Sequence, residues 1–204
     1  MKQFVITGIG TDVGKTVVSA IVAEALKATY WKPVQAGDLD NSDTIKVKKL
    51  CSESVNCLPE KHALSAPISP HAAAAIDGVE ITKNDFVVPK IEGNLIIEGA
   101  GGLLVPINQK GETYLDIFEK FNLPTILVSR HYLGSINHTC LSIEALQNRN
   151  IAIKGIIYVG EEHKTTESII STKYQLPVLG RIPITENLNS EFIKTQANIL
   201  KNSL

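Results

Sequence analysis

Cysteine is scarce in this sequence. The 204 residues include three cysteines, Cys51, Cys57 and Cys140, which form neither a Cys-x-x-Cys pair nor an even set that could build a disulfide framework. Unpaired thiols are typical of a reducing cytosol. We therefore expect a cytoplasmic protein whose fold does not depend on disulfides.

Long apolar runs and an excess of positive charge are lacking too. No stretch approaches the roughly 18 apolar residues that a membrane-spanning helix needs. The amino-terminal MKQFVITGIG has one lysine and no small-residue cleavage site behind it. The formal net charge is -1 and the lysines are scattered, so no basic stripe attracts nucleic acid. We expect no signal peptide, no membrane partner and no nucleic-acid partner.

Two alternating patterns fill most of the chain. Short apolar runs predict buried parallel strands at Gln3–Thr7, Tyr30–Pro33, Asn94–Ile97, Thr125–Ser129, Ile153–Val159 and Val178–Ile182. Apolar residues at helical spacing predict helices at Lys15–Ala28, Tyr114–Phe121, Ile136–Gln147 and Thr166–Tyr174. The alternation predicts an α/β fold with a doubly wound, mostly parallel sheet and helices on both faces.

The length fits a single domain, residues 1–204. Prolines interrupt residues 52–90, which we interpret as an elaborated crossover connection.

The first predicted strand leads into the glycine-rich segment GIGTDVGKT, residues 8–16, and then into the first predicted helix. Glycines let backbone N–H groups face phosphate oxygens, and a helix amino terminus favours negative charge. Lys15 is expected to bridge the β- and γ-phosphates, and Thr16 to bind Mg²⁺. The strict motif has a glycine where this chain has Ile9. A glycine-rich turn without a ligand is the alternative, but Gly-Lys-Thr at a helix start favours nucleotide binding and a P-loop NTPase-like fold.

Two carboxylates are candidates for the same magnesium ion. Mg²⁺ bound to a nucleotide needs few protein ligands, because it keeps waters and phosphate oxygens. Glu98 follows the apolar strand Asn94–Ile97, at the edge of the sheet where ligands bind, and the weaker alternative is a buried structural acid. Asp43 is either a second ligand or the N-cap of a helix at Thr44–Leu50.

Lys32 ends the second predicted strand at the same edge of the sheet. A fixed ammonium there suits an anionic substrate or a transferring phosphoryl group. A lone lysine is more often solvated, but flanking Pro33 and Gly37 indicate a shaped turn and favour a functional role. The segment Gly134–His138 begins a helix whose free N–H groups could hold a carboxylate; alternatively Ser135 caps an ordinary helix.

Seven segments in order resemble the dethiobiotin synthetase family: GIGTDVGKT, YWKPVQAG, NSD, ISPH, IEGAGGLLVP, LGSINH and LGRIP. The resemblance implies a homodimeric, ATP-dependent ligase of biotin biosynthesis, which converts diaminononanoate, carbon dioxide and ATP into dethiobiotin, ADP and phosphate. It implies that one substrate amine takes up carbon dioxide as a carbamate and that the carbamate attacks the γ-phosphate. The second amine then displaces phosphate from the mixed anhydride and closes the ring.

The same resemblance implies roles for individual residues. Lys15, Lys32 and Thr11 would be catalytic, and Thr16, Asp43 and Glu98 would hold Mg²⁺. The implied nucleotide-binding residues are Asp12, Val13, Gly14, Lys15, Thr16, Val17, Asp43, Glu98, Gly99, Ala100, Gly101, Val159, Gly160, Ile182, Pro183 and Glu186. The implied substrate-binding residues are Lys32, Ala36, Gly101, Leu133, Gly134 and Asn137, with the LGSINH residues serving the partner subunit.

Two positions depart from the family pattern. The family usually has a serine or threonine where this chain has Ala36, so one hydrogen bond to the substrate is expected to be missing. It also tends to have an asparagine that reads the adenine edge, where this chain has Val159.

Two other functions remain open. A partition-type ATPase switch shares the phosphate loop, but such proteins carry an extra lysine where this chain has Ile9 and Gly10, and a membrane-seeking basic tail that this chain lacks. A scaffold that holds nucleotide without turnover is the second alternative, and Lys32 and Glu98 count against it.

Overall fold

A seven-stranded parallel sheet forms the centre of the molecule. The computed structural model describes residues 1–204. Its strands lie in the order β4-β2-β6-β1-β7-β8-β9, and every neighbouring pair is parallel. Their bounds are β1 Gln3–Gly8, β2 Thr29–Trp31, β4 Cys57–Leu58, β6 Leu95–Glu98, β7 Thr125–Arg130, β8 Ile153–Val159 and β9 Val178–Ile182. Ligands of such sheets bind outside the carboxyl ends of the strands, where the strand order reverses.

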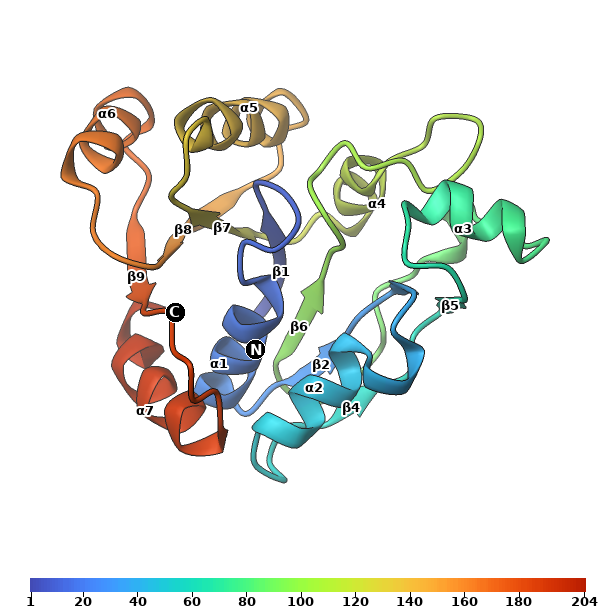
Figure 1. Ribbon diagram of the computed structural model, residues 1–204, viewed down its shortest axis with the longest axis horizontal. Coiled ribbons are helices and arrows are strands. Elements are labelled where there is room, and N and C mark those ends of the chain that lie inside the picture. The colour runs from blue at the N-terminus through green and yellow to red at the C-terminus, as the bar shows by residue number, and fades with distance from the viewer.

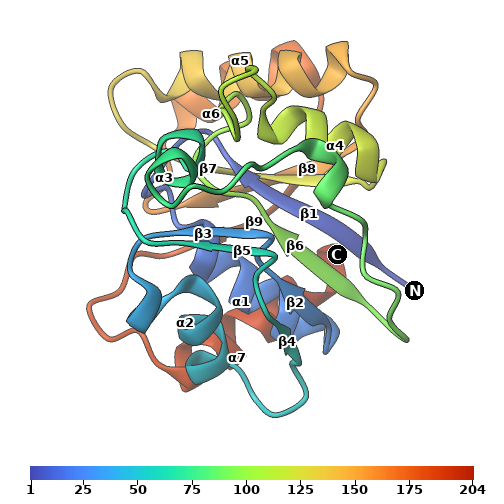
Figure 2. The same cartoon turned by 90° about the vertical axis from the view of Figure 1, so that its right-hand side faces the viewer.

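Helices cover both faces of this sheet (Figures 1 and 2). One face carries α1 (Lys15–Leu26), α2 (Asp43–Leu50) and α7 (Ser190–Leu200), and the other carries α4 (Tyr114–Phe121), α5 (Ser135–Asn148) and α6 (Lys164–Tyr174). The prediction of a doubly wound α/β fold is therefore confirmed. No helix is both long enough and apolar enough to cross a membrane.

Burial fixes the position of α1, the helix that follows the glycine-rich loop. Val18, Ile21 and Val22 are fully buried between the sheet and α7, so this helix is apolar on more than one side. On the other face, Leu115 and Phe118 of α4 pack with the strand residues Val5, Leu95 and Ile97. The central strands are thus covered on both sides, which is why they read as continuous apolar runs.

Several short elements that the apolar pattern did not predict lie within and just before the region interrupted by prolines. Strands β3 (Val34–Ala36) and β5 (His62–Leu64) form a separate two-stranded parallel sheet, and β4 pairs with β2 at the edge of the main sheet. Helix α3 (Pro70–Ile76) follows them and includes the four alanines at 72–75, which in the sequence indicate a helical turn. Strands of two or three residues are too short to show an alternation in sequence. Helix α7 was also not predicted.

Candidate active site

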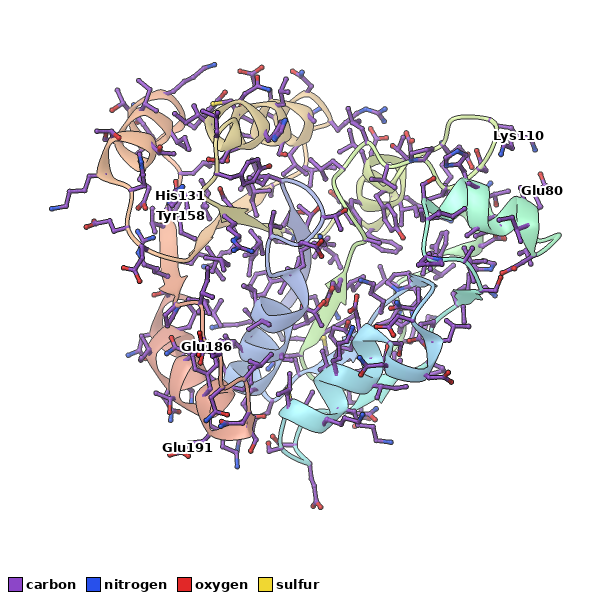
Figure 3. All side chains as sticks on the ribbon, viewed as in Figure 1. Glu80, Lys110, His131, Tyr158, Glu186 and Glu191 are labelled. Atoms are coloured by element: carbon purple, nitrogen blue, oxygen red, sulfur yellow. The ribbon has the colours of Figure 1, made fainter.

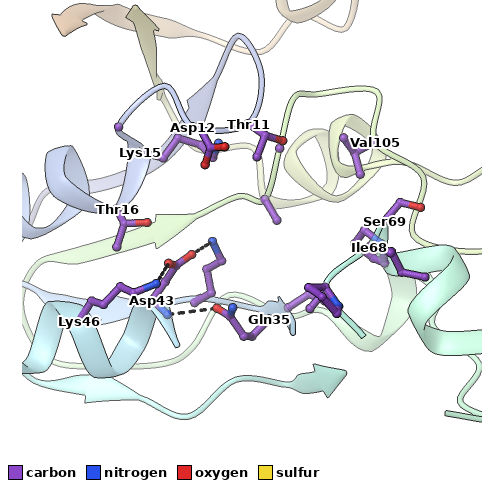
Figure 4. A pocket seen from close by; sticks show the side chains of 18 of the residues that line it. Thr11, Asp12, Lys15, Thr16, Gln35, Asp43, Lys46, Ile68, Ser69 and Val105 are labelled. Atoms are coloured by element: carbon purple, nitrogen blue, oxygen red, sulfur yellow. Dashed lines mark hydrogen bonds and ion pairs between the residues drawn. The ribbon is translucent and has the colours of Figure 1, made fainter. Parts of the chain in front are cut away.

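The loop after β1, the end of β2, the start of α2 and the turn after β6 surround a cavity of about 680 Å³ (Figure 4). Residues predicted from the sequence form much of its wall: Thr11, Asp12, Gly14, Lys15, Thr16, Val17, Lys32, Ala36, Asp43, Ala100 and Gly101. Segments far apart in the sequence therefore meet at the carboxyl edge of the sheet, as the sequence predicts.

The glycine-rich loop has the tight backbone that its glycines require. Gly14 has φ 93° and directly precedes α1, in a left-handed conformation that favours glycine. At Gly8 a Cβ atom would stand 2.6 Å from Cγ2 of Val13, so a side chain there would have to displace Val13. Ile9, where the strict motif has glycine, is buried and donates its N–H to the Val128 carbonyl at 3.1 Å, which continues the pairing of β1 with β7.

Lys15 curls back over this loop. Its Nζ donates to the Gly10 carbonyl at 2.7 Å, and 7% of the residue is exposed. Burial lowers the pKa of Lys15 to about 8, with Glu98 opposing this shift and nearby Lys32 adding to it. The side chain is thus held inside the loop, close to where phosphate groups bind in such loops.

Lys32 lies at the centre of a buried charge cluster. Its Nζ is 2.6 Å from Oδ2 of Asp43 and 3.0 Å from Oε1 of Glu98, and it also donates to the Gly99 carbonyl at 3.2 Å. Burial opposes the charge, but the two carboxylates outweigh it and raise the pKa of Lys32 above its ordinary value. Lys32 is therefore a buried, charged residue, and the alternative of a solvated lysine is wrong.

Glu98 lies behind the wall of the cavity. Its Oε1 also accepts from the Thr16 hydroxyl at 2.9 Å, and its Oε2 accepts from the Tyr30 hydroxyl at 2.9 Å. The side chain is fully buried, and neither Glu98 nor Gly99 lines the cavity itself. Glu98 thus reaches the cavity through Thr16 and Lys32.

Asp43 is held at the cavity by its helix. Ser42, not Asp43, caps α2, because the Ser42 hydroxyl accepts from the Ile45 N–H at 3.3 Å. The Asp43 N–H donates to Oε1 of Gln35 at 3.2 Å, and its carboxylate faces Lys32 and Lys46 (Figure 4). Burial would raise the pKa of Asp43, but Lys32 lowers it below its ordinary value. The interpretation of Asp43 as an N-cap is therefore wrong.

The oxygens of this cluster are of the kind that Mg²⁺ prefers. Thr16 and Asp43 line the cavity, and Glu98 is hydrogen-bonded to Thr16. No group of three or more His, Cys, Asp and Glu side chains gathers to hold an ion. The lining residues Thr16 and Asp43, with Glu98 behind Thr16, therefore fit an ion that would be held largely by phosphate oxygens and water.

A second cavity, of about 160 Å³, continues from the other side of the loop. Its wall is mainly apolar and includes Val159, Ile182 and Pro183, for which the resemblance implies nucleotide binding. Gly160 and Glu186 do not line it. The Gly160 N–H donates to the Ile182 carbonyl at 2.9 Å. Glu186 is exposed and lies in the segment between β9 and α7 (Figure 3).

Three side chains that line these cavities were not predicted from the sequence. Gln35 and Lys46 line the larger one, and Arg130 lines the smaller one and donates to the Asp12 carbonyl at 3.3 Å. Gln35 lies inside the segment KPVQAG, which could have indicated it. Lys46 and Arg130 have no sequence signal, since lone basic residues are usually solvated.

The LGSINH segment lies apart from both cavities of its own chain. Leu133, Gly134 and Asn137 line neither cavity and are exposed. Helix α5 begins at Ser135 after Gly134, whose φ is 106°, and no side chain caps it, so the alternative in which Ser135 caps the helix is wrong. Ser69 lines the larger cavity and precedes α3 without a side-chain cap, and His71 has a buried Nδ1 without a partner.

Comparisons with known proteins show which sequences this chain resembles. A family model described as an AAA domain matches residues 2–191. The ATP-dependent dethiobiotin synthetase of Christiangramia forsetii is 54% identical over 204 residues, covering 100% of this chain and 98% of the relative. Relatives of the same name are 47% identical in Rhodopseudomonas palustris, covering 92% and 90%, and 44% identical in Chlamydia pneumoniae, covering 97% and 88%.

Solved structures show the same fold at low identity. The septum site-determining protein MinD of Pyrococcus horikoshii, complexed with Mg-ADP, has a TM-score of 0.61 at 13% identity and covers 98% of this chain and 95% of its own. A plasmid partition protein of Borrelia burgdorferi bound to AMPPNP has a TM-score of 0.59 at 14% identity and covers 99% and 96%. These likenesses show the fold alone, whereas the more similar relatives share one name. The chain belongs to the family of ATP-dependent dethiobiotin synthetases.

Proposed function

We propose that this chain is an ATP-dependent dethiobiotin synthetase, which carboxylates diaminononanoate and closes the ureido ring. The observation that carries the proposal is the buried ammonium of Lys32 beside the phosphate loop, 2.6 Å from Asp43 and 3.0 Å from Glu98. A scaffold that only holds nucleotide has no need for a charge cluster that costs desolvation energy. Relatives that share this name at 42–54% identity support the substrate class.

In the proposed reaction a neutral amine of the substrate attacks carbon dioxide and loses a proton to give a carbamate. The carbamate oxygen attacks the γ-phosphorus, the bond to the β-phosphate oxygen breaks, and ADP leaves. The second amine attacks the carbonyl carbon of the mixed anhydride, loses its proton and expels phosphate. Mg²⁺, when bound by Thr16, Asp43 and Glu98, would offset charge on the triphosphate.

The residues of this chain have distinct parts in that proposal. Lys15 moves from the Gly10 carbonyl to the γ-phosphate, and Lys32 orients the carbamate against it, so the two charges offset the negative charge that spreads in the transition state. The Thr11 hydroxyl bonds the transferring phosphoryl group. A Cβ atom added at Gly101 would lie 3.6 Å from the Thr11 hydroxyl. Because glycine lacks this atom, the backbone can approach the substrate amine. Val159, Ile182 and Pro183 surround the base.

The proposal extends to the assembly. We infer that residues 1–204 form one synthetase domain and that the protein acts in the cytoplasm as a homodimer. In that dimer the helix start at Leu133, Gly134 and Asn137 holds the substrate carboxylate of the neighbouring subunit through free backbone N–H groups and the side-chain amide of Asn137.

Product analysis separates this function from its alternatives. The protein is incubated with Mg²⁺, ATP, bicarbonate and diaminononanoate, and dethiobiotin and ADP are measured by mass spectrometry. A synthetase forms the two products in equal amounts and forms little ADP when diaminononanoate is omitted. ADP formation that ignores diaminononanoate would instead indicate a partition-type switch, and nucleotide binding without either product would indicate a scaffold.

A further inference from the structure

Glu98 receives a hydrogen bond on the side away from the cavity. The Tyr30 hydroxyl donates to Oε2 at 2.9 Å, whereas Oε1 accepts from Thr16 at 2.9 Å and from Lys32 at 3.0 Å. Tyr30 is itself fully buried. The two carboxylate oxygens therefore have different partners: one faces the core, and the other faces the residues that reach the cavity.

The register of the sheet explains how Tyr30 reaches this carboxylate. In the parallel pair of β2 and β6, Tyr30 lies opposite Ile96. Glu98 is two residues beyond Ile96, and Lys32 is two residues beyond Tyr30, so all these side chains point to the face covered by α1. The Tyr30 ring packs in the core of that face, which fixes the position of its hydroxyl.

A fixed donor on one oxygen matters because the last torsion of a glutamate is soft and roughly two-fold. Without it, the carboxylate plane could rotate about this torsion, and Thr16 and Lys32 would lose an acceptor that points in a fixed direction. We propose that Tyr30 is a positioning residue, which fixes the plane of the Glu98 carboxylate so that one of its oxygens stays directed at Thr16, Lys32 and the magnesium-nucleotide. This inference rests on the proposed role of Glu98 as a partner of the metal.

Tyr30→Phe tests the inference because it keeps the buried ring and removes the donor. Binding of AMPPNP is measured by calorimetry at a series of Mg²⁺ concentrations, so that the readout does not depend on turnover. We expect the half-saturating Mg²⁺ concentration to rise about tenfold, since residues that orient metal ligands typically change metal affinity by 10- to 100-fold. Tyr158→Phe is the matched control, because Tyr158 is a buried tyrosine of β8 that stacks on His131 and makes no bond to Glu98 (Figure 3).

Glu98→Gln and the double variant Tyr30→Phe/Glu98→Gln complete the test. If Tyr30 acts through Glu98, Tyr30→Phe changes the Mg²⁺ dependence in the wild-type background but not in the Glu98→Gln background. An unchanged Mg²⁺ dependence in Tyr30→Phe, or an equal change in Tyr158→Phe, overturns the inference, even if the melting temperature falls. If Glu98→Gln itself leaves the Mg²⁺ dependence unchanged, the proposed metal role of Glu98 fails, and the role of Tyr30 fails with it.

Discussion

At the scale of single residues, the charge on Lys32 is the feature most directly tied to chemistry. We expect Lys32→Gln to lower kcat by about a thousandfold, roughly 4 kcal/mol, because the transferring group loses a fixed positive charge in a dry site. Nucleotide should still bind, since the phosphate loop is intact. Rapid-quench turnover and calorimetric nucleotide binding measure the two properties separately.

Lys46→Gln is the control for Lys32→Gln. Lys46 lies at the rim of the same cavity, 3.0 Å from Asp38, and is more than a third exposed, so its loss should change kcat by less than about tenfold. Because Lys32→Gln leaves two carboxylates without their partner, circular dichroism must show that the variant is folded. Lost nucleotide binding with retained chemistry would contradict the role given to Lys32.

Lys15 carries the second residue-scale prediction. Its Nζ now bonds the Gly10 carbonyl at 2.7 Å and can turn toward a γ-phosphate bound by the loop. We expect Lys15→Ala to abolish measurable turnover, because negative charge spreads over the transferring phosphoryl group in the transition state. A coupled assay for ADP measures the effect. Turnover within about tenfold of the wild type, roughly 1.4 kcal/mol, would contradict the assignment.

At the scale of elements, α4 fixes the end of the strand that carries Glu98. A Cβ atom on Gly99 would stand 2.7 Å from Cζ of the buried Phe118. We expect Gly99→Ala to lower the free energy of unfolding by about 1–3 kcal/mol through overpacking, and to lower turnover, because Lys32 also bonds the Gly99 carbonyl. Urea unfolding measures the first effect.

Gly102→Ala is the matched control in the same turn. Its Cβ atom would meet nothing closer than 3.8 Å, so its stability should stay within about 0.5 kcal/mol of the wild type. Combining Gly99→Ala with Phe118→Leu should recover part of the lost stability, since the smaller side chain relieves the contact. Equal effects of the two alanines would show that the clash with α4 is not the cause.

The ends of β8 and β9 form the pocket assigned to the base, and its wall is mainly apolar. Val159 has no hydrogen-bonding group in its side chain. We expect GTP and CTP to support turnover with kcat/KM within about tenfold of ATP, since one good hydrogen bond is worth roughly 1 kcal/mol. Measuring kcat/KM for each nucleotide at saturating diaminononanoate decides this.

Val159→Asn sharpens the test of the base pocket. An amide can offer the adenine edge both a donor and an acceptor, so this variant should prefer ATP more strongly than the wild type. A wild-type preference for ATP above about a thousandfold, roughly 4 kcal/mol, would show that other groups read adenine.

The helices and strands also show which features of the fold the sequence could predict and which it could not. Strands such as β1 and β7 and helices such as α4 were predicted within about two residues, because their apolar periods extend over a whole element. The phosphate loop and Lys32 were predicted because their chemistry is local. The contact of Tyr30 with Glu98 was not, since it depends on the register between β2 and β6, which are more than sixty residues apart.

At the scale of the whole molecule, α5 and the turn before it leave apolar side chains uncovered. Leu133, Ile136 and Leu141 are all exposed, with Leu133 fully so. The residues assigned to the substrate carboxylate lie in the same segment and line neither cavity of their own chain. Both facts agree with a site that two subunits complete together, in which case the two halves of the site can be disabled on different chains.

We therefore expect Lys15→Ala and Asn137→Ala chains to be inactive alone and to recover activity when mixed. After subunit exchange about half of the dimers are hybrids, and each hybrid has one intact site of two, so activity should reach about a quarter of the wild-type value. A mixture of Lys15→Ala and Lys32→Gln chains is the control, because both residues line the cavity of one chain and every hybrid site keeps one defect. Recovery in the control, or none in the test mixture after exchange is verified by native mass spectrometry, would mean that Asn137 does not serve its neighbour.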